Sequence, residues 1–106
     1  MERVMDLPLV IQHEVEDYAK GHWWKSAGYA VSDISRRIYT VVVVPDRPRP
    51  FPARVVVMAR IVDNYVVIDE DTTDRPLWQE LVQAGIPRAK IICLYAGEQI
   101  PDGQPG

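Results

Sequence analysis

The sequence predicts an α+β protein with a single domain, on three observations. The chain has 106 residues, which is enough for one hydrophobic core but not for two. Two segments repeat apolar residues at helical spacing, while other segments are rich in β-branched residues. Hydrophobic residues make up 47% and charged residues 25% of the chain, as in globular proteins. We expect the domain to span residues 1–96 and the Gly- and Pro-rich segment 97–106 to be a disordered tail.

The first element is expected to be an amphipathic helix over residues 7–20. One face of this helix would carry Leu7, Val10, Ile11, Val15, Tyr18 and Ala19. Asp6 and Pro8 favour its start, because a carboxylate suits the free backbone N–H groups and Pro tolerates the first turn. The connection that follows carries Trp23 and Trp24. These two residues are either partner-binding anchors or part of ordinary core or edge packing.

Five segments are expected to be strands, of which the first four form an antiparallel meander: 29–35, 37–44, 53–62, 65–70 and 90–95. Segment 45–52 is rich in Pro, which lacks the N–H that a sheet requires, and is therefore expected to be a loop. Asp63 and Asn64 predict a tight hairpin. Residues 41–44 and 55–59 are apolar at successive positions. Both faces of the sheet should thus be covered, one by helices and the other by a second subunit, and we predict a dimer.

A second helix is marked at both of its ends. Thr73 or Asp74 is expected to cap its start, and Pro76 fits its first turn. Its apolar side would consist of Leu77, Trp78, Leu81, Val82 and Ala84. Gly85 favours the left-handed conformation that ends a helix, and Pro87 prevents its continuation.

The residues around this helix follow a recognisable order. An acidic motif precedes the helix, a Glu-Leu pair lies within it, and a Gly-Ile-Pro-Arg turn follows it, at Asp71, Thr73, Asp74, Glu80, Leu81, Gly85, Ile86, Pro87 and Arg88. This order resembles the XisI family, whose acidic motif is Asp-x-Thr-Glu. Asp33, Arg36 and Tyr39 also stand where that family has Asp, Arg and Tyr. The matched positions Asp71, Thr73, Asp74, Gly85 and Pro87 are interpreted as structural.

The resemblance implies a controlling or accessory factor for excision of a DNA element, named after the fdxN element. Such a factor would be non-enzymatic and would bind a XisH-like partner, which looks like a nuclease-fold protein, and would work beside a site-specific recombinase. Two other hypotheses remain: an antitoxin-like inhibitor of a nuclease-fold partner, and a small metal-dependent enzyme that uses the carboxylates of residues 69–74. The resemblance does not decide whether DNA is contacted directly.

The sequence itself favours no catalytic residue, metal ligand or cofactor. The acidic run 69–74 is explained by its place before a helix, and strand alternation points Asp69 and Glu70 to opposite faces. His13 and His22 have no nearby Cys or His at the spacing of a zinc site. Cys93 lies in an apolar strand, where a thiolate is disfavoured.

Arginines are the remaining candidates for a contact site. Arg47, Arg49 and Arg54 lie in or beside the proline-rich loop, with Arg36 and Arg37 on the neighbouring strand. They are either contacts for phosphates or partner carboxylates, or ordinary solvated side chains. The net charge of -3 argues against a surface that binds nucleic acid everywhere, but it leaves room for a local basic patch.

The sequence also bears on location. Cys93 is the only cysteine, and no basic-then-apolar leader opens the chain, so we expect a cytoplasmic protein. The longest apolar runs are far shorter than the roughly 20 residues that cross a bilayer, so we expect no contact with a membrane.

Overall fold

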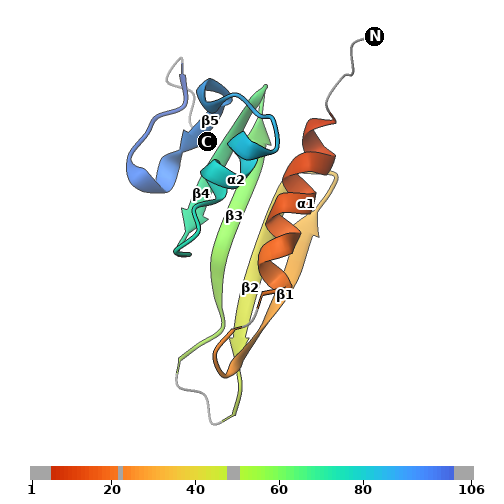
Figure 1. Cartoon of the computed structure of the whole chain (residues 1–106), viewed down its shortest axis with the longest axis vertical. Helices are drawn as coiled ribbons and strands as arrows, with labels where there is room; N and C mark the ends of the chain where they lie inside the picture. Colours follow the sequence, from red (N-terminus) through yellow and green to blue (C-terminus); the bar gives the residue numbers. More distant parts are fainter. Residues whose placement is uncertain (1–5, 22, 48–50, 102–106) are drawn as a thin grey trace.

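A mixed five-stranded sheet carries the fold, and both α-helices lie on the same face of it (Figure 1). The computed structural model describes residues 6–21, 23–47 and 51–101. Its elements in chain order are α1 (Leu7–Ala19), β1 (Ser26–Asp33), β2 (Ile38–Pro45), β3 (Arg54–Val62), β4 (Tyr65–Asp71), α2 (Leu77–Gln83) and β5 (Ile91–Cys93). Short 3-10 helices at Arg88–Lys90 and Leu94–Ala96 flank β5. The α+β class and both helices are as predicted.

The expectation of a four-stranded antiparallel sheet is wrong in one respect. The strands follow one another across the sheet in the order β1-β2-β3-β4-β5, and the first three pairings are antiparallel. The last strand, β5, adds to the same sheet and runs parallel to β4, with Val66 opposite Ile91. The physical reason is α2, which carries the chain back to the end of the sheet where β4 began, so that the next strand must run in the same direction.

The main core lies between the helices and one face of the sheet. Alternate residues of β2 are buried there, among them Tyr39, Val41 and Val43. They pack with residues of the neighbouring strands and of both helices, including Ile11, Val15, Val57, Ala59, Ile68, Leu77 and Leu81. A smaller cluster of Val67, Ile92 and Ile100 covers the other face, but only over β4 and β5.

Ordered contacts continue beyond residue 96, where we expected the domain to end. The Glu98 carboxylate accepts from the Cys93 backbone N–H at 2.8 Å and lies 2.7 Å from Arg88 Nη2. These two contacts hold the pKa of Glu98 below its usual value, the backbone hydrogen bond first. Ile100 is only 6% exposed. Of the expected tail, residues 102–106 lie outside the described residues.

Within the described ranges, no helix is long and apolar enough to cross a membrane.

β1 begins three residues earlier than the expected segment 29–35 and includes Gly28. A Cβ at this position would lie 2.8 Å from Trp23 Nε1 and 3.1 Å from the Ala19 carbonyl oxygen. Gly28 therefore allows Trp23 and the end of α1 to lie directly against the strand.

We predict that Gly28→Ala destabilises the protein by about 1–3 kcal/mol, because the added methyl group has no space. The free energy of unfolding from urea denaturation measures the effect. Gly21→Ala is the matched control: its Cβ would meet only the Tyr18 carbonyl oxygen at 3.5 Å, an ordinary contact, so no loss of stability is expected. Equal stability of Gly28→Ala and the wild-type protein would contradict the proposed close approach.

Candidate interaction surfaces

Asp71 ties the end of β4 to the start of α2. Its Oδ2 accepts from the Leu77 backbone N–H at 2.7 Å. Its Oδ1 accepts from the Thr73 backbone N–H at 3.0 Å and lies 2.7 Å from the Thr73 hydroxyl. The expected cap by Thr73 or Asp74 is therefore wrong, and Pro76 is the N-cap residue rather than part of the first turn. A carboxylate six residues upstream caps the helix because the chain turns sharply between Asp71 and Pro76.

Gly85 ends α2 with a φ of 109°. The Gly85 N–H donates to the Val82 carbonyl and the Ile86 N–H donates to the Leu81 carbonyl, both at 3.0 Å. This is the double hydrogen bond of a Schellman motif, and Ile86 is buried against the core beyond it. Pro87 follows directly and begins the turn to the 3-10 helix.

The other acidic residues of segment 69–74 have separate roles. The Asp69 carboxylate accepts two hydrogen bonds from Arg60, at 2.6 and 3.0 Å, and both side chains are mostly buried. This contact raises the pKa of the Arg60 guanidinium. In the described part of the chain, no three His, Cys, Asp or Glu residues are grouped so that they could hold a metal ion. A metal at Asp69 or Asp71 would have to displace the ion pair or the helix cap.

The remaining candidates for chemistry lie apart from one another. Cys93 is 3% exposed, and burial raises the pKa of its thiol, which disfavours the thiolate needed of a nucleophile. His13 is exposed on α1, 3.4 Å from Glu14. His22 lies outside the described residues.

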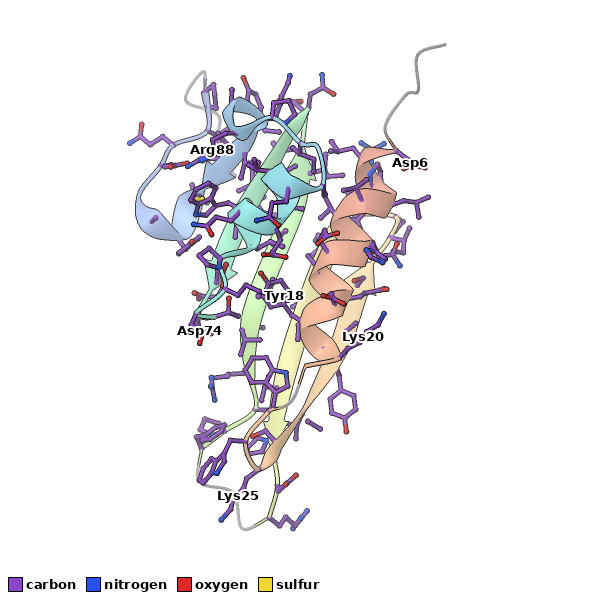
Figure 2. The ribbon with its side chains drawn as sticks, viewed as in Figure 1. Asp6, Tyr18, Lys20, Lys25, Asp74 and Arg88 are labelled. Carbon is purple, nitrogen blue, oxygen red and sulfur yellow. The ribbon has the colours of Figure 1, made fainter. Side chains whose placement is uncertain are left out.

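A groove of about 570 Å³ opens between the end of α1 and the loop that precedes α2. We call it the Tyr18 groove; its lining is Asp17, Tyr18, Lys20, Gly21, Trp23, Thr73, Asp74 and Arg75. Figure 2 shows Tyr18 lying between α1 and the loop that carries Asp74. The groove thus joins residues that are more than 50 positions apart in the sequence.

Tyr18 and Arg75 hold the two walls of this groove together. The Tyr18 hydroxyl donates to the Arg75 carbonyl oxygen, and the Arg75 guanidinium lies 4.4 Å from the centre of the Tyr18 ring. Arg75 also lies 3.7 Å from the Asp17 carboxylate. Burial raises the pKa of Tyr18 to about 12, so its hydroxyl remains a donor at neutral pH. Lys20 and Asp74 are exposed on the two sides of the groove and are available to a partner.

The two tryptophans have different surroundings. Trp23 is half-buried against the core, and its Nε1–H donates to the Tyr18 carbonyl oxygen at 3.1 Å. Trp24 is 70% exposed. Trp23 thus fits the packing interpretation, whereas Trp24 keeps a ring that a partner can reach.

The structure divides the candidate arginines between opposite ends of the sheet. Arg36 and Arg37 lie in the turn between β1 and β2, and Arg37 is not part of a strand but has a φ of 57°. Arg47 and Arg54 lie at the other end, where β2 stops and β3 starts. Arg49 lies outside the described residues. The four described arginines therefore do not form one site.

The sheet face away from the helices is uncovered over β1, β2 and β3 by the described residues. We call this apolar surface the open face; it comprises Ala27, Tyr29, Val31, Ile38, Val42, Val44, Val55 and Met58. Tyr29 and Val31 are each 55% exposed, and Val55 is 39% exposed. The expectation that helices cover one face holds, and the second face is free to meet another surface.

The fold and these surfaces define a small α+β protein with candidate interaction surfaces. Asp69, Asp71 and Cys93 have structural positions in it. A sequence model of the family described as XisI protein matches residues 1–101. The chain belongs to the XisI family.

Two solved structures from Anabaena variabilis ATCC 29413 share the fold. A XisI-like protein is 24% identical, with a TM-score of 0.73 over 90% of this chain and 86% of that chain. The fdxN element excision controlling factor XisI is 20% identical, with a TM-score of 0.67 over 84% of this chain and 83% of that chain. Among curated proteins, no significant match was found.

The cap of α2 yields a stability prediction. We expect Asp71→Ala to lower the free energy of unfolding by about 1–3 kcal/mol, because the Leu77 and Thr73 N–H groups lose their acceptor. Asp74→Ala is the control and should change stability by no more than about 0.5 kcal/mol, since Asp74 is exposed. Urea denaturation of both variants measures the difference. The reverse order of effects would show that Asp74 is the cap after all.

Proposed function

We propose that this protein is a controlling factor for excision of a DNA element and that it acts by binding a XisH-like protein. Its membership of the XisI family supports the role, and one structural relative bears the name fdxN element excision controlling factor. A site-specific recombinase is the further partner that such a role implies. The proposed place of action is the cytoplasm, where a DNA element is excised.

The hydrogen bonds of the acidic motif are the observation that supports action by binding. Asp71 stabilises the start of α2, and both of its oxygens accept hydrogen bonds from the backbone of the loop and the helix. The loop that it fixes, with Thr73 and Asp74, becomes one wall of the Tyr18 groove. The motif thus shapes a surface, which supports a role in binding.

The Tyr18 groove is our candidate site for the XisH-like partner. It combines an aromatic wall of Tyr18 and Trp23 with exposed charges of both signs, Lys20 and Asp74. Aromatic residues dominate the binding energy of protein interfaces, and charges at the rim select the partner. The Tyr18 hydrogen bond and the Arg75 contacts hold the groove in shape before binding, which lowers the entropic cost of association.

We predict that a XisH-like protein co-purifies with this protein when the two are co-expressed, and that Lys20→Glu lowers the affinity about tenfold by reversing a rim charge. Isothermal titration calorimetry measures the affinity. Lys90→Glu is the matched control, because Lys90 is also exposed but lies near the opposite end of the molecule. The absence of any complex would refute the proposed role, whereas equal affinities of both variants would refute only the groove as its site.

The same complex separates an accessory factor from an inhibitor. If the protein were an antitoxin-like inhibitor, nuclease activity of the XisH-like partner would disappear upon binding. If it is an accessory factor, that activity remains and excision of the element requires both proteins.

We also propose that the protein forms a homodimer through the open face. At the border of this face Arg60 and Asp69 neutralise each other. Two exposed carboxylates also lie at its rim, Asp33 opposite Ile38 and Glu70 opposite Met58. A second copy presents the same largely apolar centre, and in a symmetric interface the carboxylates at the rim can keep their contact with solvent. The face also includes the edge strand β1, which has no neighbour on its outer side.

The expected result for the wild-type protein is a dimer in size-exclusion chromatography with light scattering, and for Val31→Glu a monomer. The introduced carboxylate would be buried at the interface without a partner. Val82→Glu is the matched control, since Val82 is an exposed valine on α2 and lies on the helical side of the sheet. A wild-type monomer, or dissociation of the control as well, would refute the proposed dimer interface.

A further inference from the structure

Cations and aromatic rings gather at one end of the sheet. We call this the hairpin end and define it by Trp24, Lys25, Arg47, Phe51 and Arg54. The strand register brings them together, because Ser26 pairs with Pro45 and Val43 pairs with Arg54. The Asp46 N–H donates to the Lys25 carbonyl at 2.8 Å and fixes the connection before β1 to the end of β2. Figure 2 shows Lys25 at this end, far from Asp6 and Arg88.

The hairpin end has a charge opposite to that of the whole chain. The chain has a net charge of -3, but Lys25, Arg47 and Arg54 are cationic here and only Asp46 is anionic in the adjoining described residues. All four residues are exposed. A local positive potential on an acidic protein attracts polyanions to one place, while the negative charge of the remaining surface repels them.

Each aromatic ring at this end carries a cation on its face. Lys25 Nζ lies 5.1 Å from the centre of the Trp24 ring, and Arg54 Cζ lies 4.5 Å from the centre of the Phe51 ring. Trp24 is 70% exposed and contributes little to the core, in contrast to Trp23. A large ring in this position gains little stability from burial, and most of its surface remains accessible to a ligand.

The backbone also holds this arrangement in an uncommon conformation. Lys25 has a φ of 47°, in the left-handed region that side-chain-bearing residues seldom adopt. Hydrogen bonds on both sides keep it there: Ser26 N to the Trp23 carbonyl at 3.3 Å, and Asp46 N to the Lys25 carbonyl. Trp24 and Lys25 therefore project from a defined turn instead of a freely moving chain.

We propose that the hairpin end binds unpaired nucleotides of DNA. Lys25, Arg47 and Arg54 contact phosphates, and the Trp24 ring stacks on a base. Surfaces that bind single-stranded nucleic acid combine aromatic rings with cations, because every base has a face that can stack and every nucleotide has a phosphate. A duplex offers its phosphates but hides the faces of its bases, and the carboxylates of an acidic protein do not stack on a Trp ring as a base does. This inference goes beyond partner binding and does not depend on the Tyr18 groove.

The test uses the full-length protein and a fluorescein-labelled single-stranded 20-mer, with fluorescence anisotropy as the readout. We expect log affinity to fall with log salt concentration with a slope of about 2, since three phosphate contacts are made. Trp24→Ala should weaken binding about tenfold through the loss of one stacked base, while Trp24→Phe should retain most of the affinity. Arg54→Ala should reduce the salt slope by about 0.7.

Arg36→Ala is the matched control for Arg54→Ala. It removes the same exposed charge from the opposite end of the sheet and should leave DNA binding unchanged. Circular dichroism establishes that each variant is folded.

Three results would overturn the proposal: no binding of the 20-mer at low salt, equal affinity for a duplex of the same length, or equal loss of affinity in Arg54→Ala and Arg36→Ala. A fourth would assign the surface to a protein instead: Trp24→Ala weakens the XisH-like complex but not DNA binding. Failure of the proposed partner function is distinguishable, because Lys20→Glu tests the groove and leaves the hairpin end intact.

Discussion

The Asp71 carboxylate is the contact on which the arrangement of the C-terminal half depends. By accepting from Leu77 and Thr73 it fixes both the direction in which α2 leaves β4 and the shape of the intervening loop. The direction of α2 brings the chain back so that β5 runs parallel to β4. The shape of the loop places Arg75 over Tyr18 and closes one side of the groove. One side chain thus couples the sheet topology to a candidate binding surface.

The sequence predicted the elements whose signals are local. The apolar spacing of α1, the Asp63-Asn64 hairpin and the role of Gly85 depend on residues within a few positions of one another, and the structure has the helix, the turn and the cap there. The cap by Asp71 could not be predicted, because its distance from Leu77 depends on the path of the loop. The direction of β5 is likewise a result of packing, since a short apolar strand has the same pattern whether it is parallel or antiparallel.

The candidate surface residues were predicted by type but not by grouping. Five arginines appeared to form two neighbouring sets, yet Arg36 and Arg37 lie one strand length away from Arg47 and Arg54. The two tryptophans differ although they are adjacent in the sequence: Trp23 packs against the core and Trp24 is exposed. Gly28 decides this difference: without a side chain there, Trp23 turns inward against α1, and Trp24, its neighbour in the chain, points to the solvent.

The three proposed surfaces occupy different sides of the molecule, and this has a consequence for assembly. The Tyr18 groove is lined by α1 and the loop before α2, whereas the open face is the sheet face away from the helices. The hairpin end lies where β2 stops and β3 starts (Figure 1). The sites proposed for a protein partner, a second copy and DNA therefore consist of different residues. A dimer whose twofold axis runs along the strands places both hairpin ends together and doubles the local positive charge. An axis across the strands places them at opposite ends of the dimer, so that the two positive regions would remain separate.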